Sequence, residues 1–141
     1  MADNLLKINL ALSLFLTGLI WTIQLVHYPA FRYVETQRFI EFTQFHQKWI
    51  TPIVALPMIL ELLSSLALVW LKPSHLIVIC FVLVLIIWMT TFFLSVPFHA
   101  ELNKGFDLET IERLISSNWI RTMAWTLKTG LLIFILNRAT Q

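Results

Sequence analysis

Cysteine and charged residues are scarce in this chain of 141 residues, and each shortage excludes a class of protein. Only 13% of the residues are charged, whereas a soluble domain has about a quarter. The single cysteine, Cys80, lies inside an apolar run, so the chain has neither a disulfide framework nor a CxxC metal motif. A net charge of +2 is too small to indicate nucleic-acid binding.

Three short sequence signals are also missing. No HxxxH or HExxH pair is present, so no two metal ligands come from one helical turn. Gly18 and Gly130 are isolated, and they form no GxxxG dimerisation motif. The first apolar run lacks an Ala-x-Ala-type end, and we interpret it as a retained membrane span rather than a cleaved signal peptide.

Apolar residues are what the chain has in excess. They make up 58% of the sequence, and the mean hydropathy is +0.79. A membrane span needs about 20 mostly apolar residues, and four segments approach or exceed that length: 5–26, 50–71, 76–96 and 119–136. Because lipid satisfies no backbone polar groups, each span is predicted to be an α-helix. Pro52 and Pro57 are expected to kink the second helix or to mark its first turn.

The connections between these segments predict the topology. The link at residues 72–75 is very short and therefore requires an antiparallel hairpin. The other two connections run for about 20 residues each, and both have partly helical patterns. In the second of them, Asp107 is a candidate helix cap. We predict an all-α fold: one integral membrane domain over residues 1–141, built as an antiparallel four-helix bundle.

The two halves of the chain resemble each other. Pro29 and Pro97 follow the first and third spans, Glu-Thr pairs follow at 35–36 and 109–110, and Trp-Ile pairs begin at Trp49 and Trp119. This order indicates a degenerate 2+2 duplication of a two-span unit, although apolar helices also resemble one another by chance. A duplication predicts pseudo-two-fold symmetry about an axis along the membrane normal.

Two charged residues lie near the middle of the predicted membrane. Each of the four spans carries a polar stripe at helical spacing, which is expected to face the bundle interior. Glu61 and Lys128 belong to these stripes at depths within about 5 Å of each other. We predict a buried ion pair, or a protonated Glu61. In the alternative, Lys128 reaches the membrane surface and Glu61 bonds only to Ser64 or Ser65.

Three histidines are predicted to lie at one membrane edge, because each stands at a junction on the same side. These are His27, His46 and His99. Three imidazoles would suit a transition metal, with Glu35, Glu41 or Glu101 as a fourth ligand, and two could instead hold a haem. Each histidine taken singly is also an ordinary interfacial residue.

The densest polar motif opens the fourth span at residues 118–122. Arg121 is a candidate for binding an anionic substrate or a lipid headgroup, with Asn118 orienting the substrate. Trp119 and Trp125 flank Arg121 and are further candidates for substrate binding. The simpler interpretation is a lipid-phosphate anchor in an aromatic belt.

Four stretches resemble those of a group of small uncharacterised four-span bacterial membrane proteins. They are QLVHYPAF at 24–31, PMILE at 57–61, VPFH at 96–99 and NWIRT at 118–122. Through the last stretch the layout distantly resembles the anthrone-oxygenase-like membrane proteins. The first resemblance implies the bacterial inner membrane and no particular activity. The second implies oxidation of a hydrophobic aromatic or quinol-like substrate.

The sequence therefore leaves two candidate functions. The first is a metal- or haem-dependent oxidoreductase acting on a lipophilic small molecule, with His27, His46, His99 and Glu61 as its chemical groups. The second is a non-enzymatic accessory subunit or a binder of lipid, pigment or cofactor. The positive-inside rule favours a cytoplasmic long-loop side, because six basic residues lie there: Arg32, Arg38, Lys48, Lys104, Arg113 and Arg121.

Overall fold

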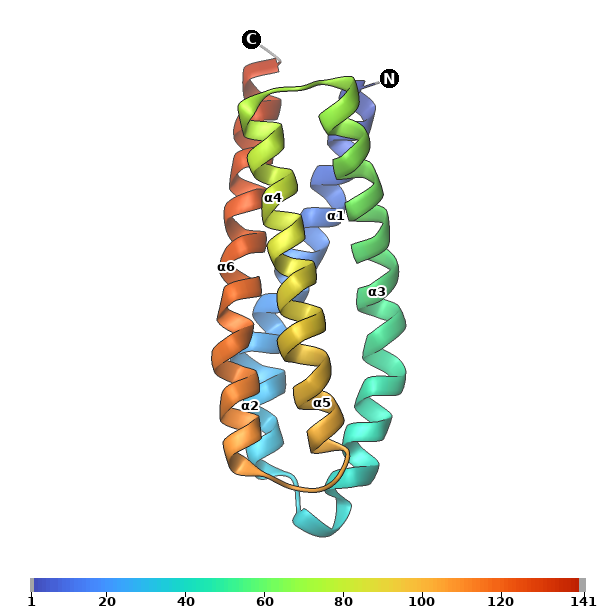
Figure 1. Ribbon diagram of the computed structural model, residues 1–141, viewed down its shortest axis with the longest axis vertical. Coiled ribbons are helices and arrows are strands. Elements are labelled where there is room, and N and C mark those ends of the chain that lie inside the picture. The colour runs from blue at the N-terminus through green and yellow to red at the C-terminus, as the bar shows by residue number, and fades with distance from the viewer. Residues whose placement is uncertain (1, 140–141) are drawn as a thin grey trace.

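A computed structural model describes residues 2–139 and forms a single antiparallel four-helix bundle (Figure 1). Each span is a long helical rod. The elements in chain order are α1 (Ala2–Thr22), η1 (Ile23–His27), α2 (Tyr28–Ala30), η2 (Phe31–Tyr33), η3 (Thr36–Arg38), α3 (Phe39–Leu71), α4 (His75–Thr90), η4 (Thr91–Ser95), α5 (Val96–Leu102) and α6 (Leu108–Ala139). Both ends of the chain lie beside the link between α3 and α4, and the other two links lie at the opposite end.

The long connections prove to be helical extensions of the spans rather than loops. Helix α3 has 33 residues and α6 has 32, which makes each close to 50 Å long. The hydrocarbon core of a bilayer is only about 30 Å thick. The bundle therefore extends beyond the hydrocarbon. All four rods are long and apolar enough to cross a membrane, as expected of an integral membrane protein.

A single turn of π-helix interrupts the first and third spans at equivalent places. The Tyr28 N–H bonds to the carbonyl of Ile23, and the Val96 N–H bonds to the carbonyl of Thr91. The next residue in each case is a proline, which lacks an N–H and crowds the preceding turn, so a widened turn accommodates it. The matching bulges support the predicted duplication. Pro52 and Pro57, by contrast, lie inside α3 without ending it.

Local capping starts the last helix. The Asp107 carboxylate accepts hydrogen bonds from the N–H groups of Glu109 and Thr110, which confirms the predicted cap. Hydrogen bonding from Thr110 holds the pKa of Asp107 below its ordinary value. This cap fixes where α6 begins and thereby the register of the polar residues further along that helix.

Each half of the chain packs in the same way. Helix α1 contacts α3 and α6, and α4 contacts α6 and α3. One apolar cluster lies toward the terminal end and contains Leu6, Leu68, Ile77, Cys80 and Leu132. A larger one, with Leu16, Ile20, Phe31, Phe39 and Trp125 among its members, lies toward the long-loop end. Large apolar side chains also cover the outside of the bundle, as lipid contact requires.

Candidate functional site

A buried ion pair lies in the middle of the bundle. Lys128 Nζ is 2.9 Å from Glu61 Oε1, and both side chains are essentially inaccessible to solvent. The structure thus brings together the two charges that the sequence predicted to pair. The alternative interpretation is wrong, because Lys128 does not reach the surface and the Glu61 carboxylate does not bond to Ser64 or Ser65.

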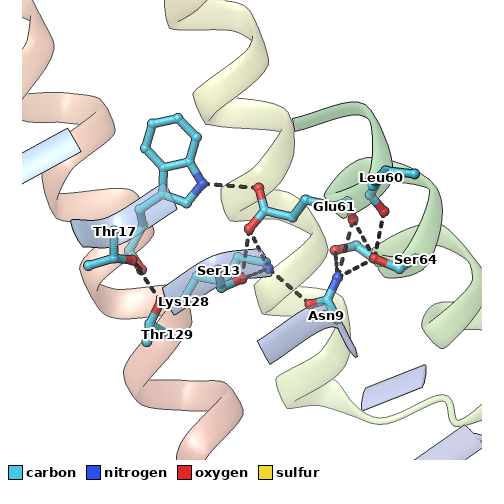
Figure 2. Close-up of polar contacts among 10 residues, drawn as sticks. Asn9, Ser13, Thr17, Leu60, Glu61, Ser64, Lys128 and Thr129 are labelled. Carbon is cyan, nitrogen blue, oxygen red and sulfur yellow. Dashed lines mark hydrogen bonds and ion pairs between the residues drawn. The ribbon is translucent and has the colours of Figure 1, made fainter. Parts of the chain in front are cut away.

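Helix α1 supplies the polar groups that surround this pair (Figure 2). Ser13 Oγ donates to Glu61 Oε1 at 2.7 Å and accepts from Lys128. Lys128 also donates to Asn9 Oδ1 at 3.0 Å. The Asn9 amide nitrogen in turn donates to Ser64 Oγ at 2.7 Å and Ser65 Oγ at 2.9 Å. Because these groups satisfy one another, the network suits a structural role that ties α1, α3 and α6 together.

Trp125 joins the ion pair to a second polar group nearer the membrane edge. Its indole Nε1 donates to Glu61 Oε2 at 3.0 Å. The guanidinium of Arg121 lies 5.3 Å from the centre of the Trp125 ring, a cation–π distance. Trp125 is almost fully buried, so it connects the two charged groups inside the bundle.

Arg121 is buried among neutral partners. Its Nη1 donates to Ser95 Oγ at 3.1 Å and to Asn118 Oδ1 at 3.3 Å. Asn118 also donates to the Gln24 side-chain oxygen at 2.8 Å. The Tyr28 hydroxyl interacts with the guanidinium as well. Among the residues that the structure describes, no carboxylate forms a salt bridge with Arg121, although only 4% of this residue is exposed.

The three histidines meet beside this arginine, as predicted. His27 Nε2 is 2.7 Å from His46 Nδ1, a hydrogen-bond distance, and the His46 and His99 rings lie 5.3 Å apart. His99 Nε2 is 3.1 Å from the Tyr28 hydroxyl. All three rings pack around Phe31, which is completely buried.

The histidines are not arranged as a cluster of metal ligands. Within residues 2–139, no group of three or more His, Cys, Asp or Glu side chains is arranged to hold a metal ion. His27 and His46 are joined directly, whereas two imidazole nitrogens on one tetrahedral Zn²⁺ lie about 3.3 Å apart with both lone pairs aimed at the ion. Glu101, one of the three candidate fourth ligands, pairs with Lys104 at 2.8 Å. The haem alternative stays a prediction.

A cavity of about 370 Å³ opens next to Arg121, between α3 on one side and α4, η4 and α5 on the other. Its polar end is formed by Arg121, His99 and Tyr28, and most of its remaining lining is apolar. The lining residues are Ile23, Tyr28, Ile50, Thr51, Val54, Ala55, Met58, Ile59, Trp88, Thr91, Phe92, Ser95, Val96, His99 and Arg121.

Unpaired polar atoms are concentrated in residues around this cavity. Among the described residues, four buried side-chain nitrogens have no hydrogen-bond partner, and three of them belong to residues that line the cavity: Trp88 Nε1, His99 Nδ1 and Arg121 Nε. The fourth is His46 Nε2, beside His99. These nitrogens are enclosed by protein atoms, and such a concentration is unusual in a native protein.

The predicted duplication pairs a small residue of one half with a large residue of the other. Aligning Trp49 with Trp119 places Ala55 opposite Trp125. The Trp125 ring is buried in the core of the bundle, whereas Ala55 lines the cavity.

Several residues of this site were not predicted from the sequence, and of the four predicted substrate-binding residues only Arg121 lines the cavity, whereas Asn118, Trp119 and Trp125 do not. Tyr28 and Trp88 carry no periodic polar signal, whereas Gln24 and Ser95 belonged to polar stripes that could have identified them. Trp119 is 39% exposed and packs edge-on against Trp21 at 5.6 Å, so it does not reach the cavity.

Comparisons with known proteins add no further assignment. A scan against models of known families matches nothing, and comparisons with curated proteins and with solved structures also give no match. The resemblance to small four-span bacterial membrane proteins thus stays a prediction from the four sequence stretches.

Proposed function

We propose that this integral membrane protein binds a lipophilic small molecule in the cavity between α3 and the α4–η4–α5 rod. The polar part of the molecule contacts Arg121, His99 and Tyr28, and its apolar part lies along α3. The observation that carries the proposal is the coincidence of a largely apolar cavity with Arg121, a buried cation in its lining that forms no salt bridge with the described residues.

The energetics favour an occupied cavity. A buried charge without a counter-charge is costly in a low-dielectric interior, and a polar group beside Arg121 lowers that cost. The ligand also removes its own apolar surface from contact with water or lipid headgroups. The cavity volume of about 370 Å³ lies within the range of small-molecule sites.

The apolar lining determines how a ligand enters. Ile59, Phe92 and Val96 line the cavity and are each about half exposed on the outside of the bundle. Because this outer surface contacts lipid, a lipophilic molecule reaches the cavity sideways from the bilayer. The polar group of this molecule then lies at the long-loop end of the cavity, near the membrane edge.

The oxidoreductase activity expected from the sequence would use the same cavity, because the histidines lie at its polar end. Binding of a lipophilic molecule is the step that both functions share, and it is the function that the geometry supports best. His99 lines the cavity directly, whereas His27 and His46 lie behind it. Oxidation therefore stays a prediction that depends on an electron acceptor.

Photo-crosslinking tests the proposal. The protein in phosphatidylcholine nanodiscs is irradiated with a diazirine-labelled dodecanol, and labelled residues are mapped by peptide mass spectrometry. We expect saturable labelling of cavity residues such as Val54 and Met58, displaced by excess unlabelled dodecanol. Ala55→Trp should remove this labelling by filling the cavity, as Trp125 does in the repeat.

A neighbouring substitution provides the control. Leu56 is 61% exposed and does not line the cavity, so Leu56→Trp should leave the labelling unchanged. If cavity residues label no more than lipid-facing residues such as Leu63, or if labelling persists in Ala55→Trp, the proposed binding function is wrong.

A further inference from the structure

We propose that the ligand of this cavity is a negatively charged amphiphile, with a carboxylate or phosphate head bound by Arg121 and an apolar chain along α3. This inference rests on the proposed function and names the chemical class of its ligand. It follows from charge balance, from the free edge of the guanidinium and from the composition of the lining.

Within residues 2–139, two cations are buried, and protein groups neutralise only one of them. Lys128 pairs with Glu61 at 2.9 Å inside a complete hydrogen-bond network. Arg121 is also buried, yet it contacts two neutral side chains and an indole ring. A buried arginine stays charged, and an uncompensated charge in a low-dielectric interior is costly. An anion in the cavity supplies the missing counter-charge.

Part of the Arg121 guanidinium lines the cavity. Nη1 is occupied by Ser95 and Asn118, and Nε is enclosed by protein without a partner, which leaves Nη2 to contact an anion. Elsewhere in this chain Arg32 Nη2 lies 2.7 Å from a carboxylate oxygen of Glu112. An anion beside Arg121 Nη2 makes the equivalent charge-assisted contact.

The rest of the lining favours negative charge. The lining includes an arginine and a histidine, and no aspartate or glutamate lines this cavity. The Tyr28 hydroxyl is a further hydrogen-bonding group at the same end. Arg121 is the one charged side chain among the lining residues, and the rest of the cavity is largely apolar. The molecule that fits therefore has one charged head and an uncharged chain.

The test compares probes that share a chain and differ in the head. Diazirine-labelled dodecanol is displaced by unlabelled dodecanoate, dodecyl phosphate, dodecanol or dodecyltrimethylammonium in phosphatidylcholine nanodiscs at pH 8. We expect the two anions to displace it at about tenfold or more lower mole fraction than dodecanol, as a charged hydrogen-bonded pair implies. Dodecyltrimethylammonium should displace the probe least. Whichever of dodecanoate and dodecyl phosphate displaces it at the lower mole fraction identifies the head group.

Two variants connect this preference to Arg121. Arg121→Gln should remove the advantage of the anions while dodecanol still competes. If Arg121→Gln does not fold, Thr51→Glu places a carboxylate in the same lining, and Thr51→Gln is its neutral control. Thr51→Glu should weaken displacement by dodecanoate about tenfold without weakening dodecanol.

The outcomes separate the two proposals. Equal displacement by dodecanol and both anions in the wild type overturns the anionic head and leaves the proposed binding function intact. If diazirine-labelled dodecanol gives no saturable labelling that any competitor displaces, both the anionic head and the proposed binding function are wrong. Retained anion preference in Arg121→Gln, or in Thr51→Glu, contradicts the assignment of the head to Arg121.

Discussion

Trp125 donates its indole N–H to Glu61 at 3.0 Å while its ring centre lies 5.3 Å from the Arg121 guanidinium. This single side chain therefore joins the neutralised charge pair in the middle of the bundle to the arginine at the candidate site. Lys128 has a carboxylate partner, whereas Arg121 forms no salt bridge with the described residues. The contrast supports a structural role for the first group and the proposed ligand binding at the second.

Breaking the buried pair should destabilise the bundle. Glu61→Gln leaves Lys128 as a buried unpaired charge, and Lys128→Met does the same to Glu61, so each should lower the free energy of unfolding by about 3–5 kcal/mol. The double variant should recover much of this loss, because neither charge remains. Thermal unfolding in detergent measures the effect, and wild-type stability in Glu61→Gln would contradict the pair.

Replacing Trp125 by phenylalanine should cost about 1–3 kcal/mol of stability. The change removes the hydrogen bond to Glu61 and weakens the cation–π contact with Arg121 while keeping an aromatic ring. Trp70→Phe is the matched control, because Trp70 is 80% exposed. Equal melting temperatures for the two variants would show that the contacts of Trp125 with Glu61 and Arg121 do not contribute to stability.

The amide pair above the cavity should be energetically coupled. Asn118 donates to the Gln24 oxygen at 2.8 Å, and both side chains are buried. Gln24→Leu and Asn118→Leu are each expected to destabilise the bundle by about 1–3 kcal/mol, because each removes a hydrogen-bond partner of the other amide. The double variant should cost clearly less than the sum of the two. Strict additivity in the double-mutant cycle would contradict the hydrogen bond.

Metal analysis tests the interpretation of the histidines. Because His27 and His46 are joined directly, we expect the purified protein to hold substoichiometric zinc, copper and iron and to lack a Soret band. A stoichiometric metal or haem that disappears in His46→Ala would reverse this interpretation and restore the metal centre predicted from the sequence.

Acid should loosen the start of α6. Hydrogen bonds from Thr110 lower the pKa of Asp107 beneath its ordinary value of 3.8, so the cap stabilises the folded state above that value. Its contribution is lost as the pH falls through the lowered pKa. Amide exchange at residues 109–111 should be faster in Asp107→Ala than in wild type at neutral pH, and the two should converge in acid. Identical exchange at neutral pH would contradict the cap.

Much of the fold could be predicted, because long apolar segments in lipid have few alternatives. Four spans and their antiparallel order follow from segment length and from the short link at 72–75. The depth of Glu61 and Lys128 could be estimated because helical rise is regular. The π-helical turns before Pro29 and Pro97 were not predicted, since helical periodicity does not record one extra residue.

The candidate site was located more successfully than it was interpreted. Helix junctions placed His27, His46 and His99 together, but spacing alone does not distinguish imidazoles that bind a metal from imidazoles that bind each other. The cavity depends on a small residue, Ala55, at a position where the repeat has Trp125. An alanine at position 55 does not by itself indicate a cavity, because the packing of the surrounding helices must be known first.

Native mass spectrometry of the protein taken from its own membranes tests the central claim most directly. Wild type and Leu56→Trp should each retain one lipophilic small molecule at close to one copy per chain, and Ala55→Trp should retain none. A wild-type protein that carries no such molecule, or an Ala55→Trp protein that carries as much as wild type, would contradict the account.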